Sequence, residues 1–226
     1  MKNNTMRLAF LSLLLASLPA AHADVLHWGG GSTDVADDTA LPTSGAAFSG
    51  TWNTTTKNWA ATNAPGPYGA FTPGALADLG YVSIASSTDA VITNAADLIL
   101  SGLMSVTHGN NYNQRITLKA TSPKAITFTG DEALVYTFAT EGTRGLSVES
   151  SVSFAGSAPW LMTSPQGVFI TKSSANANSG AMNLRGNGSF ILSDGGTMPL
   201  VPEWNLKGTL FLGGSSQSFS GPQLIV

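Results

Sequence analysis

The chain contains no cysteine and very little charge. Its 226 residues include no Cys, and only 10% are Asp, Glu, Lys or Arg, against about a quarter in an average soluble protein. The absence of cysteine excludes a disulfide-stapled fold and a thiolate metal site. The formal net charge is −3. Because nucleic-acid binding needs a basic footprint, this charge argues against a nucleic-acid partner.

The chain also lacks an apolar run long enough to span a membrane as a helix. Its N-terminal run, Leu8–Leu18, falls short of the about 20 apolar residues that a bilayer requires. Lys2 and Arg7 precede this run, and an Ala21-His22-Ala23 cleavage signal follows it. This order is typical of a secretory signal peptide. We therefore expect cleavage near Ala23 and a secreted or outer-membrane-surface protein.

Short apolar runs recur along the rest of the chain at steps of about 21 residues. In every run the third and fifth residues are apolar, and in a strand these two positions share one face. The runs are Gly80–Ile84, Gly102–Val106, Lys124–Phe128, Arg144–Val148, Gln166–Ile170, Gly188–Leu192 and Gly208–Leu212. Stacking equivalent runs buries each of them, which is typical of a parallel β-helix. We predict an all-β, right-handed parallel β-helix of about 20–22 residues per coil; the alternative is a β-sandwich.

Two tryptophans flank three threonines in the stretch GTWNTTTKNW. Pairing Trp52 with Trp59 leaves Thr54–Lys57 as a hairpin loop of ordinary length. We predict that this hairpin caps the open N-terminal end of the β-helix, with at least one Trp buried. The alternative is a carbohydrate-binding platform on which sugars stack against Trp52, Trp59 and Tyr68.

The expected organisation has three parts. A signal peptide occupies residues 1–23, a cap region with the hairpin occupies 24–79, and β-helix coils occupy 80–226. The chain ends in apolar Leu224-Ile225-Val226, whereas solenoids usually end in a polar cap. We expect the N-terminal part of a longer protein, with membrane association only through a missing C-terminal region.

Several segments resemble the autotransporter-associated β-strand repeat proteins. GTLFLGGSSQSFSG (Gly208–Gly221) is similar to that repeat, and GNGSFILSDGG (Gly186–Gly196) is a weaker copy. WGGGS (Trp28–Ser32), followed by GTWNTTTKNWA, resembles the opening module of such proteins. The resemblance implies a large secreted or surface-displayed β-helical protein of a Gram-negative bacterium. It also implies no common catalytic residues.

Acidic residues gather at two places. Asp34, Asp37 and Asp38 lie close together, but their spacing matches neither the EF-hand loop nor the glycine-rich calcium repeat. A solvated acidic loop is favoured over a calcium site. Asp131 and Glu132 follow Gly130, and adjacent strand residues point to opposite faces. A turn is therefore favoured over a pair of catalytic carboxylates.

The other candidate residues are two histidines and an apolar stripe. His27 and His108 have no Cys or paired carboxylate near them in sequence, so we expect surface or loop positions and no metal site or triad. Phe169, Ile191 and Phe211 hold the fourth position of three runs and are expected to face outward. A stripe of this kind either binds a partner or is covered by the loop at residues 173–180, which we favour.

The favoured function is a non-enzymatic, adhesin-like structural protein without a cofactor, whose partner is an extracellular glycan or another surface molecule. One alternative is a carbohydrate-binding module that uses exposed aromatic side chains. The other is a β-helical carbohydrate-active enzyme whose site lies in the missing part.

Overall fold

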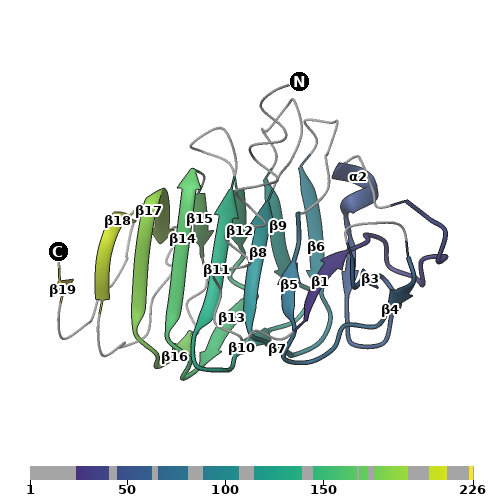
Figure 1. The fold of residues 1–226 in the computed structure, drawn as a ribbon, viewed down its shortest axis with the longest axis horizontal. Coiled ribbons are helices and arrows are strands. Elements are labelled where there is room, and N and C mark those ends of the chain that lie inside the picture. The colour runs from purple at the N-terminus through teal and green to yellow at the C-terminus, as the bar shows by residue number, and fades with distance from the viewer. Residues whose placement is uncertain are drawn as a thin grey trace.

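The computed structural model describes residues 24–40, 45–62, 66–80, 89–106, 115–138, 145–166, 168–172, 176–192, 204–212 and 224–225. These residues form short β-strands that advance steadily from one end of the molecule to the other (Figure 1). Most strand pairs are parallel, and within the described part of the chain the one helix is the single turn α2 (Gly45–Phe48). The prediction of an all-β protein with parallel sheets is confirmed. The predicted signal peptide lies outside the described residues.

The strands form three rows, within which neighbours are hydrogen-bonded in parallel. The first row contains β2 (Gly50–Trp52), β6 (Ala90–Asn94), β9 (Ile116–Ala120), β12 (Gly145–Val148) and β15 (Val168–Thr171). The second row contains β7 (Leu98–Leu100), β10 (Lys124–Phe128), β13 (Val152–Gly156) and β16 (Ala177–Asn178). The third row contains β1 (Val25–Trp28), β5 (Leu76–Asp78), β8 (Gly102–Val106), β11 (Ala133–Phe138) and β14 (Trp160–Gln166).

Two long strands join the first row to the third. The first half of β17 (Met182–Leu192) pairs with β14, and its second half pairs with β15. The next strand, β18 (Trp204–Leu212), follows β17 through both rows, and β19 (Leu224–Ile225) then pairs with the start of β18. The first and third rows therefore belong to one 15-stranded sheet, which also contains β17, β18, β19 and the short strands β3 (Trp59–Ala60) and β4 (Tyr68–Gly69) beside β1. The second row is a separate 4-stranded sheet.

The distance in sequence between paired residues varies from one pair of strands to the next. Gly102 pairs with Leu134, a step of 32 residues, whereas Phe190 pairs with Leu210, a step of 20 residues. The constant step expected from the sequence would have paired Gly102–Val106 with Lys124–Phe128. That pairing is wrong, because β8 and β10 belong to different rows. Connections of unequal length separate the strands, so equal spacing in sequence does not identify paired strands.

One hydrophobic core runs through the described part of the chain, from Leu26 to Leu184. Alternate residues of each strand reach it, as the pleat of a strand requires. Leu103, Val135 and Met162 occupy equivalent positions in the third row and all belong to this core. Met104, which the sequence pattern assigned to the core, is buried outside this cluster. The predicted inward and outward faces of Gly102–Val106 are therefore reversed.

Aromatic rings fill the N-terminal end of this core. Trp52 and Trp59 lie with ring centroids 4.8 Å apart, and Phe71 contacts both rings at 5.1 and 4.8 Å. Both tryptophans are buried, as the cap prediction requires of at least one. Edge-to-face and tilted contacts of this kind add to the burial of aromatic surface. We name Trp28, Trp52, Trp59 and Phe71 the aromatic cluster.

The predicted hairpin between Trp52 and Trp59 is wrong. Trp52 lies in β2, which pairs in parallel with β6. Trp59 lies in β3 (Trp59–Ala60), which pairs antiparallel with β1 and with β4 (Tyr68–Gly69). Between them Asn53 Oδ1 accepts hydrogen bonds from the backbone N–H groups of Thr55 and Thr56. This Asx turn sends the chain to a different strand partner, although the two rings still meet.

The regions on either side of residue 80 share the same core. β5 of the expected cap region pairs with β8, and β2 pairs with β6. A separate cap domain and coil domain remain a prediction. Among the described residues no helix has the length and apolar character needed to cross a membrane.

Candidate functional site

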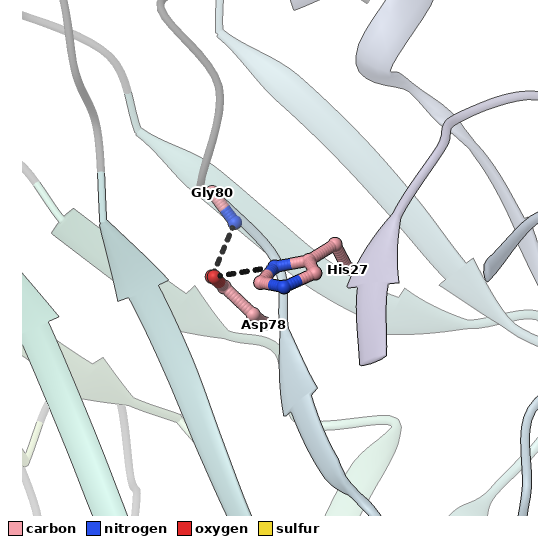
Figure 2. A network of polar contacts seen from close by, with 3 residues as sticks. All are labelled: His27, Asp78 and Gly80. Carbon is pink, nitrogen blue, oxygen red and sulfur yellow. Dashed lines mark hydrogen bonds and ion pairs between the residues drawn. The ribbon is translucent and has the colours of Figure 1, made fainter. Parts of the chain in front are cut away.

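The most notable polar contact in the described core joins His27 to Asp78 (Figure 2). His27 Nδ1 lies 3.1 Å from Asp78 Oδ2, the distance of a hydrogen bond from the imidazole N–H to the carboxylate. The other carboxylate oxygen, Oδ1, accepts the backbone N–H of Gly80 at 3.1 Å. Asp78 is fully buried and His27 is 8% exposed. Burial of this carboxylate is tolerated because both of its oxygens have hydrogen-bond partners.

The strand pairing produces this contact. β1 and β5 are parallel neighbours, and their register places His27 directly opposite Asp78. Met104 of β8 is the next residue in the same line, followed by Tyr136 of β11. All four side chains are buried. The pair thus lies within a packed sheet and connects the first strand of the described chain to β5.

The described neighbours of the pair along this line are a thioether and a phenol. A histidine and a carboxylate orient a nucleophile only if a hydroxyl or thiol lies within hydrogen-bond reach. The neighbour along the line is the thioether of Met104. Burial raises the pKa of Tyr136 to about 12, so this phenol stays protonated at neutral pH. The contact between His27 and Asp78 joins the neighbouring strands β1 and β5 inside the sheet.

Sequence reasoning missed this pair. His27 was expected at the surface or in a loop, because no Cys or paired carboxylate lies near it in sequence. It lies instead in strand β1, with a partner 51 residues away in sequence. A local search cannot find such a contact, because strand register brings the two residues together. His108 lies outside the described residues.

The three aromatic residues proposed as a sugar-stacking platform lie in the interior. Trp52, Trp59 and Tyr68 are 0%, 1% and 5% exposed. The Tyr68 hydroxyl donates to the carbonyl oxygen of Thr39 at 3.0 Å, and burial raises the pKa of this phenol. A sugar ring must reach an open aromatic face to stack on it. In this structure none of the three rings offers such a face.

Two of the three carboxylates of the acidic loop accept hydrogen bonds within the protein. Asp34 Oδ1 accepts the backbone N–H of Lys57 at 2.8 Å, and Asp37 Oδ1 accepts that of Tyr68 at 3.0 Å. These two bonds hold the loop against the segments that carry Trp59 and Tyr68. In the described ranges no three His, Cys, Asp or Glu side chains form a group that could hold a metal ion.

Asp131 and Glu132 occupy the turn that the sequence predicted. They lie between the end of β10 and the start of β11, and Gly130 precedes them with a φ of 99°. Asp131 is exposed and Glu132 is half-buried. A residue with this positive φ is ordinarily glycine, so Gly130 sets the direction of the turn.

The proposed apolar stripe of Phe169, Ile191 and Phe211 does not form one line. The backbone register pairs Phe169 with Phe190, and it pairs Ile191 with both Ile170 and Phe211. Phe169 and Ile191 therefore stand one residue apart in the backbone register. The predicted stripe is wrong, because the sequence pattern aligned Phe169 with Ile191, one residue beyond its partner Phe190.

Comparison of the chain with protein-family models, with curated proteins and with solved structures finds no match.

Proposed function

We propose that the chain forms a right-handed parallel β-helix and serves as a secreted or surface-displayed structural, adhesin-like protein. The order in which the strands pair is the observation that carries this proposal. From β6 to β16 the chain visits the first, second and third rows in turn, and each strand from β6 to β14 pairs in parallel with the third strand after it. A chain that adds one strand to each row on every circuit follows the path of a helical coil. The right-handed form follows the rule for parallel crossover connections.

The varying pairing steps fit coils of 20–22 residues that carry insertions toward the N-terminal end. Residues 79–89, 107–115 and 139–144 connect the third row to the first in three successive circuits. In the next circuit a single residue, 167, separates β14 from β15. Insertions in a solenoid extend loops from one side without disturbing the stack. A stack of parallel strands of this kind suits a scaffold that presents contacts to an extracellular glycan or another surface molecule.

A non-enzymatic role is supported by the way the polar side chains are used. Asp89 Oδ1, just before β6, accepts the backbone N–H of Arg115, just before β9. Asp97 Oδ1, just before β7, accepts that of Ala125 in β10. Asp78 contacts the ring of His27 on the neighbouring strand β1, and it also accepts the backbone N–H of Gly80 two residues later. These carboxylates hold successive circuits together. Catalysis by paired carboxylates would require them to converge on an open cleft.

Membership of the autotransporter-associated β-strand repeat proteins, and export through the leader at residues 1–23, belong to the same proposal. They are supported by the repeat-like segments at Gly186–Gly196 and Gly208–Gly221 and by the leader's charge pattern. The alternative of a carbohydrate-binding module loses its main support, because Trp52 and Trp59 are buried.

Disulfide trapping tests the proposed coil, since the chain has no cysteine of its own. Thr127 and Ala155 are paired neighbours in β10 and β13 and are both half-buried. Thr127→Cys with Ala155→Cys should cross-link rapidly on mild oxidation. The matched pair Thr127→Cys with Ser153→Cys is displaced by two residues and should cross-link slowly. The opposite order of rates would contradict the register on which the coil rests.

Export and surface display test the function. The full chain, produced in a Gram-negative host, should lose residues 1–23 and appear outside the inner membrane, while Lys2→Glu with Arg7→Glu should retain it inside. Purified residues 24–226 should leave a panel of polysaccharides intact. Turnover of any polysaccharide would overturn the non-enzymatic role, and retention of the unaltered chain in the cytoplasm would overturn export.

A further inference from the structure

The first row of strands has its N-terminal edge covered by a backbone segment that is not itself a strand. β2 is the first strand of this row and pairs on one side with β6. On its other side lies Gly31, which donates its N–H to the carbonyl oxygen of Ser49 at 3.1 Å and accepts the N–H of Thr51 at 3.0 Å. Gly31 thus takes the position of a neighbouring parallel strand.

The second row is covered in the same way at β7, its first strand. The N–H of Gly74 donates to the carbonyl oxygen of Ile99 at 2.8 Å, and the N–H of Ser101 donates to the carbonyl oxygen of Ala75 at 3.1 Å. Unpaired backbone groups on an edge strand are a template on which another chain can add a strand. At β2 and β7 a segment of the same chain already pairs with these groups.

The third row continues past β1 into the short strands β3 and β4 (Figure 1). Among the described strands, β4 pairs with β3 alone. Its other edge meets a side chain, because Asp37 Oδ1 accepts the backbone N–H of Tyr68 at 3.0 Å. In a continuing sheet, an N–H on this edge would donate to a carbonyl oxygen of the next strand. The Asp37 carboxylate therefore occupies the position of that acceptor.

Two further contacts place the Asp37 loop along the edge of β4. The hydroxyl of Tyr68 donates to the carbonyl oxygen of Thr39 at 3.0 Å. The backbone of Asp37 lies so close to Gly66 that a Cβ on Gly66 would collide with the Asp37 carbonyl oxygen. Gly66 also has a positive φ of 31°, which a glycine adopts readily. The loop thus lies beside residues 66–68, where a strand of another chain would have to lie.

We propose that Asp37 prevents β4 from pairing with a strand of a second copy of the chain. Without this carboxylate, the Tyr68 N–H becomes a free donor on an edge strand. β4 of one copy then pairs antiparallel with β4 of another, because two copies that meet through the same edge form a two-fold symmetric contact. The inference goes beyond the proposed structural role, since it names the end of the stack that is excluded from contacts between copies and the residue that excludes it.

Sedimentation equilibrium of the full chain and its variants tests the proposal. Asp37→Ala should form dimers with a dissociation constant at least about tenfold lower than that of the unaltered chain, because two edge N–H groups gain partners across the contact. The matched control is Asp38→Ala, which removes a neighbouring exposed carboxylate and should associate like the unaltered chain. Asp37→Asn keeps an acceptor oxygen for the Tyr68 N–H and should also behave like the unaltered chain.

Hydrogen exchange locates the new contact. In Asp37→Ala the amide of Tyr68 should exchange more slowly as the protein concentration rises, whereas in the unaltered chain its exchange should not depend on concentration. Equal dissociation constants for Asp37→Ala and Asp38→Ala would overturn the proposal, as would dimers in which the Tyr68 amide stays unprotected. Strong association of Asp37→Asn would overturn the role of the acceptor oxygen.

A second variant keeps the test decisive if Asp37→Ala loses the circular dichroism spectrum of the folded chain. Gly66→Ala retains the carboxylate but pushes the Asp37 backbone away from β4, because the added Cβ collides with it. This variant should also dimerise more tightly than Asp38→Ala, with the same concentration-dependent protection of the Tyr68 amide. Association equal to that of Asp38→Ala would overturn the proposal.

Discussion

Trp28 and Phe48 are joined by a hydrogen bond of 2.7 Å, from the indole N–H of Trp28 to the carbonyl oxygen of Phe48. Phe48 ends α2, and Trp28 ends β1. The bond therefore ties the one-turn helix to the first strand, at a point where both side chains are buried. The other two tryptophans of the aromatic cluster, Trp52 and Trp59, have buried indole N–H groups with no hydrogen-bond partner among the described residues.

This difference predicts unequal effects for two otherwise similar substitutions. Trp28→Phe and Trp52→Phe both remove buried aromatic volume, but only Trp28→Phe deprives a buried carbonyl oxygen of its donor. Trp28→Phe should lower the free energy of unfolding by about 1 kcal/mol more than Trp52→Phe. Urea unfolding followed by circular dichroism measures both. Equal losses would show that the bond to Phe48 contributes no net stability.

Gly156 should tolerate substitution less well than Gly130. Both have positive φ angles, 109° and 99°, so alanine is strained at either position by about 1–2 kcal/mol. A Cβ at Gly156 would also collide with the carbonyl oxygen of Phe128 on the neighbouring strand, whereas one at Gly130 would meet nothing within 4 Å. Gly156→Ala should therefore cost about 1–3 kcal/mol beyond the cost of Gly130→Ala, measured by urea unfolding.

Removing the Asp78 carboxylate should destabilise the N-terminal part of the sheet. Asp78→Ala leaves the Gly80 N–H and the His27 ring without this acceptor, which should cost about 1–3 kcal/mol or more. The exposed Asp38 offers the control, because Asp38→Ala should change stability by less than about 0.5 kcal/mol. Asp78→Asn keeps an oxygen for the Gly80 N–H and should recover part of the loss. Thermal unfolding midpoints of the three variants check this order.

Stability should fall in alkaline solution as a result of the buried Tyr136 phenol. Burial raises the pKa of Tyr136 from 10.0 to about 12. Below pH 10 the phenol is protonated in both the folded and the unfolded chain, and its contribution is constant. Between pH 10 and about 12 only the unfolded chain loses this proton, so unfolding becomes more favourable by up to about 1.4 kcal/mol per pH unit.

Tyr136→Phe removes this titration and supplies the control. Its free energy of unfolding should vary less steeply than that of the unaltered chain across the same alkaline range. Urea unfolding at a series of pH values measures the two slopes. Phenolate absorbance of the folded protein follows the titration itself. Parallel slopes would exclude Tyr136 as the source of the alkaline sensitivity.

The sequence correctly predicted turn residues and core-facing apolar positions that depend on only a few neighbouring residues. Ile126 and Phe128 of β10, and Leu146 and Val148 of β12, were predicted to face the core and do so. Gly130 was predicted to precede a turn, and its φ angle agrees. These features depend on residues within one strand or one turn, so the nearby sequence contains the information needed.

The pairing of the strands could not be predicted from the local sequence. The predicted register paired strands that belong to different rows, because connections of unequal length separate the strands. The predicted hairpin between Trp52 and Trp59 does not form, because Asn53 makes an Asx turn between them. The strand of Trp52 pairs with β6, and the strand of Trp59 pairs with β1 and β4. A burial pattern identifies which residues need a partner but does not identify the partner.

The sequence by itself determined that this protein is built from short strands with parallel pairing, since period-two apolar runs separated by turn residues favour strands over helices. It also determined that stability depends on packing without disulfide bonds, because the chain has no cysteine. Tertiary structure alone decided which strands are neighbours, that Trp52, Trp59 and Tyr68 are buried, and that His27 lies opposite Asp78. Those outcomes depend on long-range register, which is set by the combined packing of the whole core.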